Sequence, residues 1–312
     1  YLARKKIKTA LVDMTRKRDL YTIYTYDNTG KRNIAGDSLK YASSGKNEPL
    51  IYDKLSIYTA VPGEDRKSYN PSLLVDTIVK NNNVVLIDAD PQGNATTGIG
   101  VSKGDIDKSV YDVLTDKCSI DEAIIRSKYK RLDVLPATIN LAGIDIELIE
   151  KSREEPAFSK GSQLKNKIET VKDNYDYIIM DCPPSLGLIT TNALTASNSV
   201  IIPVQCEFFA LEGIMQLLNT IMMAQKSLNP NLDIEGVLLT MLDSRTNLGF
   251  EVVEDIRKYF KERVYNTIIP RLIRLTEAPS HGKPIVVYDP KSKGTEAYLN
   301  LAKEVIERNG TN

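Results

Sequence analysis

The sequence predicts an α/β protein, in which a mostly parallel sheet is covered by helices on both faces to form a three-layer α/β/α sandwich. From residue 84 onward, short apolar runs rich in β-branched residues alternate with longer stretches of helical periodicity. Such alternation is typical of parallel sheets, whose strands are buried on both faces. Aspartates stand at the ends of two of these runs, and ligands bind such sheets at the carboxyl ends of the strands.

Strands are expected where an apolar run is continuous, short and rich in β-branched residues. Runs of this length suit a strand better than a helix. In chain order they cover residues 84–88, 132–135, 177–180, 199–204, 236–241 and 284–287.

Helices are expected between these runs. In the last expected helix, at residues 295–308, Tyr298, Leu301 and Val305 fall on one face, and Gly310 follows as a stop signal. The expected helices cover residues 163–172, 211–228, 250–263 and 295–308.

The composition limits the classes of protein to which this chain can belong. The chain has 312 residues with 41 basic and 41 acidic side chains, so any contact with DNA needs a local basic patch. The hydrophobic content of 42% is enough for a sizeable core. Three cysteines form no CxxC pair, which favours a reducing, cytosolic setting. No apolar run approaches the ~18 residues of a membrane span, and no secretory signal opens the chain.

Residues 1–82 differ in composition from residues 83–312, and we expect two parts of the chain that meet near residues 80–84. The first part is rich in Lys, Arg, Tyr and Asn and carries several turn signals. It contains two strand-like pieces, at residues 8–12 and 55–60. The second part is expected to form the α/β domain.

Three aspartates are the strongest candidates for chemistry. Asp88 and Asp90 close the first run and project to the same side if the strand continues, while Asp181 follows the run at 177–180. An acid at the end of a buried strand suits Mg²⁺, which binds one or two carboxylates together with phosphate oxygens. The alternative is that these acids only cap the strand ends and face solvent. Two such strand ends in one sheet favour the metal site.

Four long segments resemble the ParA/Soj family of chromosome-partitioning ATPases. They include the strings VVLIDADPQGNATTGIG, YDYIIMDCPPSLG, LDSRTN and RLIRLTEAP, and the resemblance runs from about residue 83 to 309. It implies a P-loop ATPase of the deviant Walker A class, related to MinD, that binds ATP and Mg²⁺ and dimerises around ATP. It also implies DNA binding without sequence preference, and ATP hydrolysis stimulated by a ParB-type partner. A cytoplasmic, nucleoid-associated protein of chromosome or plasmid partitioning is implied, with a link to sporulation regulation.

The resemblance implies a role for each of the three aspartates. Asp90 matches the family's hydrolysis aspartate, which orients the attacking water. Asp181 matches the Walker B acid. Asp88, which precedes the hydrolysis aspartate, is implied as support for the Mg²⁺ shell.

The resemblance also assigns four residues near the carboxyl end of the chain. The segment at Pro270 and Arg271 matches the family's adenine-side loop. Arg245 and Arg274 match arginines associated with DNA binding, and both lie in segments that read as loops after strands. Arginine binds phosphate through a fork of donors without reading sequence. Without the family, an exposed arginine with no special role is the simpler interpretation.

The phosphate loop is the part of the family pattern that the chain lacks. In the family it resembles KGGVGKTT, and no such string occurs here. The nearest candidate is VPGEDRKS at residues 61–68, where Lys67 and Ser68 would bind the phosphates and Mg²⁺. Glu64 and Asp65 oppose this assignment, because each places a negative charge near the phosphates at a cost of about 1 kcal/mol per charge pair at ~4 Å in water.

Two alternatives to a working ATPase remain open. The chain could be a pseudo-ATPase that keeps only DNA or partner binding. Or residues 1–80 could be a piece of a related ATPase joined to a ParA/Soj-like remainder, with which the start at Tyr1 agrees. Loss of the first strand and its loop would weaken the sheet, unless residues 55–60 replace that strand.

Overall fold

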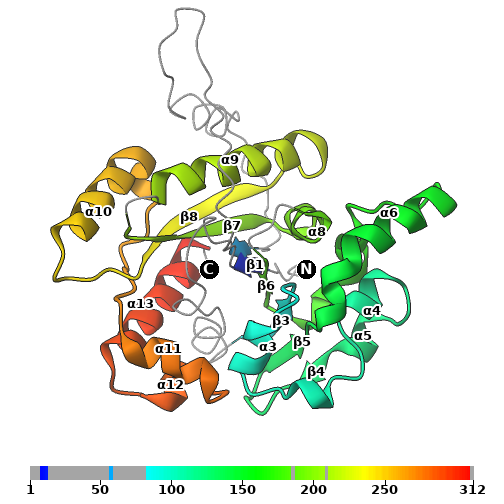
Figure 1. Ribbon diagram of the computed structural model, residues 1–312, viewed down its shortest axis with the longest axis horizontal. Coiled ribbons are helices and arrows are strands. Elements are labelled where there is room, and N and C mark those ends of the chain that lie inside the picture. The colour runs from blue at the N-terminus through cyan, green and yellow to red at the C-terminus, as the bar shows by residue number, and fades with distance from the viewer. Residues whose placement is uncertain (1–7, 13–55, 59–81, 184–186, 208–209, 310–312) are drawn as a thin grey trace, which may run out of the picture.

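The computed structural model describes residues 8–12, 56–58, 82–183, 187–207 and 210–309 (Figure 1). These residues form one sheet in the order β4-β5-β3-β6-β2-β7-β8, and β1 also pairs with β6. Within it, β4 and β5 are antiparallel and the other paired strands are parallel. The strands are β1 (Lys8–Val12), β2 (Ser56–Tyr58), β3 (Val84–Asp88), β4 (Ile125–Arg126), β5 (Leu132–Leu135), β6 (Tyr177–Asp181), β7 (Ser199–Gln205) and β8 (Asp233–Thr240).

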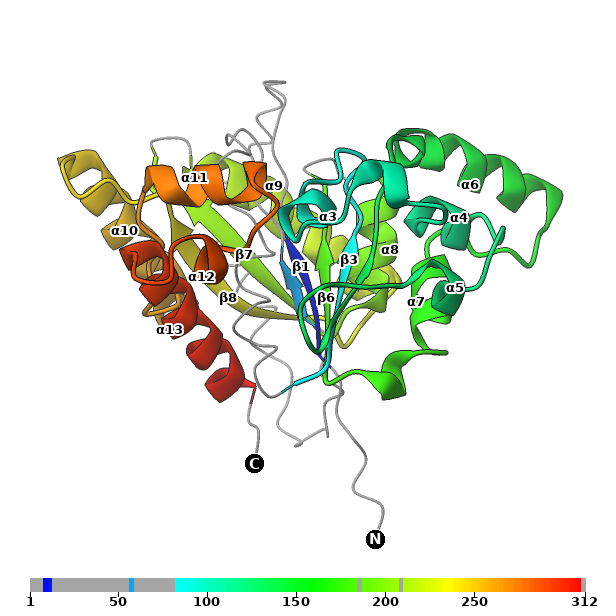
Figure 2. The same cartoon turned by 90° about the horizontal axis from the view of Figure 1, so that it is seen from below.

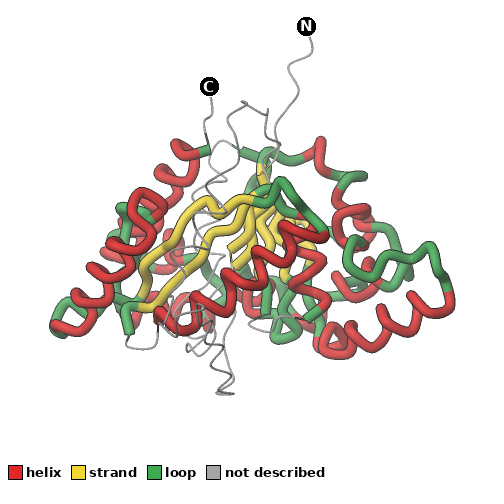
Figure 3. The backbone as a smooth tube through the Cα atoms, turned by 90° about the horizontal axis from the view of Figure 1, so that it is seen from above, coloured by secondary structure: helices red, strands yellow, loops and turns green. Residues whose placement is uncertain are grey.

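Helices pack on both faces of this sheet, so the predicted three-layer α/β/α sandwich is confirmed (Figure 2). Helices α4 to α10 bury apolar residues in one core, and α3 with α11 to α13 bury theirs in the other. Figure 3 shows the strands as a central layer with helices on either side. In this described part, no helix is long and apolar enough to cross a membrane. The helices are α3 (Asn94–Gly98), α4 (Val110–Leu114), α5 (Ile120–Ala123), α6 (Ile144–Glu154), α7 (Gln163–Ile168), α8 (Leu188–Ala196), α9 (Ala210–Ser227), α10 (Asn247–Phe260), α11 (Ile273–Ser280), α12 (Ile285–Tyr288) and α13 (Lys293–Arg308).

Strand β3 contributes to both cores. Val85 and Ile87 belong to the first core, whereas Val84 and Leu86 belong to the second. Successive side chains of a strand point to opposite faces, so a strand covered on both sides must be apolar throughout. This is why the run at residues 84–88 is continuous rather than alternating.

Strand β6 lies at the centre of the sheet, and its two edges are occupied differently. One edge pairs with β3 over the full length of both strands. On the other side the sheet continues through β2, which pairs in parallel with β6 at Ile179, Met180 and Asp181, and β1 also pairs in parallel with β6. Strand β2 also pairs with β7 and so closes the sheet between β6 and β7. The expectation that residues 55–60 can supply a central strand is confirmed for the backbone of β2.

The expected strand at residues 284–287 is wrong, because this segment begins the helix α12. The Pro284 carbonyl oxygen accepts hydrogen bonds from the N–H groups of Val287 and Tyr288, at 3.0 and 2.8 Å. Proline is tolerated at the start of a helix, and a short β-branched run does not by itself separate strand from helix. The other expected strands correspond to β3, β5, β6, β7 and β8, and the expected helices to α7, α9, α10 and α13.

Candidate functional site

The carboxyl ends of β3 and β6 bring two of the predicted site residues together. Asp88 and Asp181 are register partners there, and the Ala89 N–H donates to the Asp181 carbonyl oxygen at 2.7 Å. Both acids are buried, with 0% of Asp88 and 3% of Asp181 exposed. The alternative that they cap strand ends in solvent is therefore wrong. Buried carboxylates need hydrogen bonds, protons or a cation, so this edge has the character of a binding site.

The Asp88 carboxylate is bonded on both oxygens. Its Oδ2 accepts hydrogen bonds from the N–H and the hydroxyl of Thr96, both at 2.7 Å. Its Oδ1 accepts the Asp90 N–H at 3.2 Å. The Thr96 hydroxyl in turn accepts the Ala137 N–H at 3.2 Å. Asp88 thus ties the end of β3 to α3 and to the segment after β5.

The pKa of the Asp88 carboxyl is strongly raised. Burial is the largest cause and raises the pKa of this carboxyl, the hydrogen bonds from Thr96 lower it, and the negative charge of Asp90 raises it. The net result is a pKa of about 7 instead of the usual 3.8. Protonation and a bound cation are two ways to remove the same unfavourable charge. The pKa therefore indicates that this edge takes up positive charge near neutral pH.

Asp90 lies in the turn between β3 and α3. Its Oδ1 accepts the Gln92 N–H at 3.0 Å, and its carbonyl oxygen accepts the Gly93 N–H at 2.9 Å. Gly93 has a φ of 64°, in the left-handed region that favours glycine, and it caps α3. The turn holds Asp90 with 4% exposure immediately beyond the edge formed by Asp88 and Asp181.

The chemistry of the donors suits Mg²⁺ in part. The acids at this edge offer only oxygen ligands, which Mg²⁺ prefers. Within the described ranges, however, no three or more His, Cys, Asp or Glu side chains are grouped so that they could hold a metal ion. Mg²⁺ usually keeps waters and phosphate oxygens beside one or two carboxylates. These residues therefore fit a metal that arrives with a phosphate ligand.

The predicted adenine-side residues Pro270 and Arg271 pair with the chain just after the end of β8. Pro270 bridges to Leu242, and the Arg271 N–H donates to the Leu242 carbonyl oxygen at 3.0 Å. A cavity of about 450 Å³ is lined by residues that include Leu242 and Pro270. The Arg271 side chain is 54% exposed and lies 3.5 Å from Glu207. The structure places a hollow beside Pro270, and the adenine role stays a prediction.

The two predicted DNA arginines are exposed and paired with acids. The Arg245 side chain is 85% exposed and donates to both carboxylate oxygens of Asp243, at 2.8 and 2.6 Å. Arg274 is 59% exposed and contacts Glu277 at 3.1 Å and Asp289 at 3.7 Å. Its segment, expected as a loop, belongs to the first turn of α11. Exposure fits a surface role, and a phosphate would have to compete with these acids.

Several predicted features lie outside the described residues. Residues 61–68, with Lys67 and Ser68, are among them. The boundary near residues 80–84 also stays a prediction. Thr96, in contrast, is a site residue that the sequence analysis missed. A signal was present, since a hydroxyl residue in the first turn of a helix after an acidic turn can bond back to the acid.

The fold and this edge define a class of protein. The protein has a mostly parallel sheet between two layers of helices, and buried aspartates stand at the carboxyl ends of neighbouring central strands. This is the arrangement of P-loop nucleotide-binding proteins.

Comparison with known proteins gives the family. An AAA domain family, AAA_31, matches residues 68–234. The chain is 60% identical over 222 residues to the sporulation initiation inhibitor protein Soj of Bacillus subtilis (strain 168), across 71% of this chain and 85% of that protein. It is 47% identical over 224 residues to the chromosome partitioning protein ParA of Myxococcus xanthus (strain DK1622), across 72% and 77% of the two chains. The chain belongs to the ParA/Soj family of chromosome-partitioning ATPases.

A solved structure has a similar fold. The cobyrinic acid a,c-diamide synthase from Mycobacterium smegmatis, solved with a bound ATP analog and magnesium, superimposes with a TM-score of 0.63. The two chains are 32% identical, and the match covers 74% of this chain and 87% of the synthase.

Proposed function

We propose that this protein is a partitioning ATPase that binds ATP with Mg²⁺, dimerises around the nucleotide, binds DNA without sequence preference and is reset by a ParB-type partner. The observation that carries the proposal is the buried edge at which Asp88 and Asp181 meet, with Asp90 held just beyond it. Support also comes from the family, and from the ATP analog and magnesium bound to the synthase of the same fold.

Each acid at the edge has a separate part in this proposal. Asp90 orients the water that attacks the terminal phosphate, because its turn fixes one of its oxygens and leaves the residue next to the strand end. Asp181 holds the metal, directly or through water. Asp88 supports the metal shell by fixing α3 through Thr96. Mg²⁺ bound with ATP would neutralise charge on the phosphates.

The phosphates and the base need further residues. Lys67 and Ser68 take the place of the family's phosphate loop, and β2 supplies the strand that precedes them. Pro270 and Arg271 form the adenine side next to the cavity of about 450 Å³.

The test of this function is equilibrium binding of a fluorescent ATP analogue with Mg²⁺ to the purified protein. We expect micromolar binding that Lys67→Ala weakens at least about tenfold, which corresponds to about 1.4 kcal/mol. Lys303→Ala is the matched control, because Lys303 is an exposed lysine on α13. Asp90→Ala should bind the analogue as the unchanged protein does.

Each outcome of this titration has a distinct meaning. Equal losses in Lys67→Ala and Lys303→Ala would overturn the phosphate-loop assignment. Failure of a folded protein to bind the analogue at all would overturn the ATPase and leave the pseudo-ATPase, a module for DNA or partner binding.

The DNA part of the proposal makes its own prediction. Arg245→Ala and Arg274→Ala should each weaken binding to duplexes of unrelated sequence by a similar factor, and lower the slope of log affinity against log salt by about 1. Arg257→Ala, an exposed arginine in the last turn of α10, is the control. Fluorescence anisotropy at several salt concentrations measures both quantities. A loss confined to one sequence, or an unchanged slope, would contradict a phosphate contact.

A further inference from the structure

The connection between β8 and α10 fixes an aspartate and directs an arginine outward. Oδ1 of Asp243 accepts the Arg245 N–H at 3.0 Å, which is the bond of an Asx turn. The Asp243 carbonyl oxygen accepts the N–H and the hydroxyl of Thr246, at 3.2 and 3.1 Å. The Asp243 side chain is 19% exposed, whereas that of Arg245 is 85% exposed. The acid is therefore anchored in the turn, and the arginine reaches into solvent.

The two side chains form a bidentate ion pair. Nε of Arg245 donates to Oδ1 of Asp243 at 2.8 Å, and Nη2 donates to Oδ2 at 2.6 Å. A guanidinium has five N–H donors in one plane, so this pair occupies one edge of the fork and leaves the Nη1 donors. The hydrogen bonds from Arg245 hold the pKa of the Asp243 carboxyl well below its usual range. The acid is therefore charged near neutral pH, and the arginine is paired with a negative charge before any DNA approaches.

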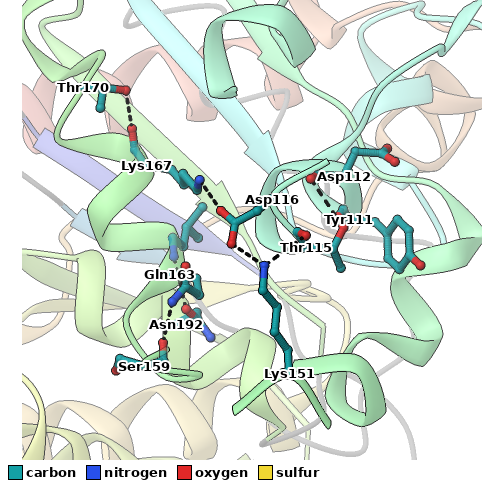
Figure 4. A network of polar contacts seen from close by, with 11 residues as sticks. Tyr111, Asp112, Thr115, Asp116, Lys151, Ser159, Gln163, Lys167, Thr170 and Asn192 are labelled. Atoms are coloured by element: carbon teal, nitrogen blue, oxygen red, sulfur yellow. Dashed lines mark hydrogen bonds and ion pairs between the residues drawn. The ribbon is translucent and has the colours of Figure 1, made fainter. Parts of the chain in front are cut away.

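This pair differs from the ion pairs that tie the fold together. Figure 4 shows Asp116, two residues after α4, between Lys151 of α6 and Lys167 of α7, and it accepts hydrogen bonds from both lysines. Those contacts join the end of α4 to two further helices. Asp243 and Arg245 stand two positions apart in one turn, so their pair does not connect separate elements. The pair therefore contributes little to the stability of the fold, and its main effect falls on what Arg245 can bind.

A phosphate that approaches Arg245 meets the charge of Asp243 in either of two ways. If it takes the edge that Asp243 occupies, the ion pair must break, and exposed pairs of this kind change an equilibrium by about 1.5- to 5-fold. If it takes the remaining Nη1 donors, two negative charges share one cation and repel each other. The charge of Asp243 therefore acts against phosphate binding, whichever edge is used.

Arg274, the other arginine proposed to contact DNA, also lies beside acids. It donates to Glu277 at 3.1 Å, and its Nε lies 3.7 Å from Asp289. The Tyr288 hydroxyl accepts from Arg274 at 3.4 Å and donates to Glu277 at 3.1 Å, so replacing Glu277 would disturb more than a charge. Asp243 gives the cleaner test. In the part of the chain that the structure describes, the hydrogen bonds to its carboxylate come from the residue that it restrains.

We propose that Asp243 limits how tightly Arg245 holds a phosphate of DNA, and so keeps DNA binding weak enough to reverse. The inference deepens the proposed function and rests on it in one respect, that Arg245 contacts a DNA phosphate. Affinity differences among variants of one interface lie mostly in the dissociation rate. An arginine that returns to its own acid therefore shortens the time that the protein stays on DNA. Such release suits a protein that must leave DNA when it is reset.

The central variant is Asp243→Asn, because asparagine keeps an acceptor oxygen for the turn and for the arginine and removes only the charge. Arg245→Ala and the double variant of Asp243→Asn with Arg245→Ala complete a cycle with the unchanged protein. The cycle separates the local pair from the general effect of losing a negative charge, since the general effect persists without the arginine. Glu251→Gln is the control, because Glu251 is an exposed acid on α10 and its loss changes the net charge equally.

Fluorescence anisotropy of a labelled duplex, with ATP and Mg²⁺ at one salt concentration, measures the dissociation constants. Asp243→Asn should tighten DNA binding about threefold, and a chase with unlabelled duplex should show dissociation slowed by a similar factor. Glu251→Gln should change the affinity less than about 1.5-fold. In the Arg245→Ala background, Asp243→Asn should also change it less than about 1.5-fold. The gain in Asp243→Asn should shrink at high salt, because exposed charges are screened.

Each outcome supports the inference or overturns it. Equal or weaker DNA binding in Asp243→Asn overturns it, because the acid then positions the arginine and does not restrain it. A gain that persists in the Arg245→Ala background overturns it as well, since the effect is then one of general charge.

A failure of the proposed function looks different. If the unchanged protein binds no DNA, or if Arg245→Ala binds DNA as tightly as the unchanged protein does, the DNA role proposed for Arg245 fails. Elution from phosphocellulose, whose phosphate groups present the same chemistry, then decides. Elution of Asp243→Asn at higher salt, with no such shift in the Arg245→Ala background, supports the restraint, and equal elution overturns it.

Discussion

Replacing Asp90 by alanine is expected to lower the rate of ATP hydrolysis by about 10²- to 10⁴-fold, with little change in the binding of ATP and Mg²⁺. The reason is geometric, because the turn that follows β3 holds this carboxylate beside the end of the strand that carries Asp88. A group that orients water acts on the reaction and not on the bound ground state. Single-turnover phosphate release, together with binding of a fluorescent ATP analogue, measures the two effects separately.

The matched control for this variant is Asp107→Ala, which removes an exposed aspartate away from the strand ends. It should leave hydrolysis unchanged. If Asp90→Ala lowers binding and hydrolysis by the same factor, Asp90 supports the ground-state complex and its assignment to the attacking water is wrong.

The second large effect concerns stability and pH. In metal-free and nucleotide-free buffer, we expect Asp88→Asn to stabilise the protein relative to the unchanged chain at pH 8, by an amount that shrinks toward pH 4. Asp88 has a folded-state pKa of about 7 against the usual 3.8 of an aspartate, chiefly because it is fully buried. The difference of about 3 pH units corresponds to at most about 4 kcal/mol.

The direction follows from the protons bound in each state. Between pH 3.8 and about 7 the folded chain keeps a proton on Asp88 that the unfolded chain has lost. Raising the pH through this window therefore favours unfolding, and the stability contributed by Asp88 is present below pH 3.8 and lost above about 7. Asparagine carries no titrating proton at this position, so the difference between the two proteins isolates this one group.

Urea unfolding at several pH values between 4 and 8 measures this difference. Asp107→Asn is the control, and it should run parallel to the unchanged protein. A difference between Asp88→Asn and the unchanged protein that stays constant over this range would show that Asp88 does not titrate there.

Much of the fold could be predicted because its strands and helices follow from patterns among neighbouring residues. The strands expected at residues 84–88 and 132–135 match β3 and β5 residue for residue. Such runs identify strands that are buried on both faces. The run that became α12 shows the limit of this reasoning. Four β-branched and apolar residues fit either element, and the contacts of Pro284 with the next turn decide between them.

The candidate site was predictable in its acids and not in the bonds that hold them. A strand that ends in aspartate indicates Asp88 and Asp181, and the structure places the two side by side. Thr96 escaped the sequence analysis, although it donates two hydrogen bonds to Asp88. The bond that the Thr96 hydroxyl accepts from the Ala137 N–H carried no signal, because the two residues lie 41 positions apart.

The sequence by itself determined the α/β class, the central strands and the identity of the acids, since these depend on the order of neighbouring residues. Only the tertiary structure decided that β2 lies between β6 and β7 in the sheet and that Asp88 is bonded on both oxygens. The physical reason is the distance along the chain over which each effect acts. Periodicity and propensity act over a few residues, whereas the pairing of two strands or the burial of a carboxylate depends on which distant segments the folded chain brings into contact.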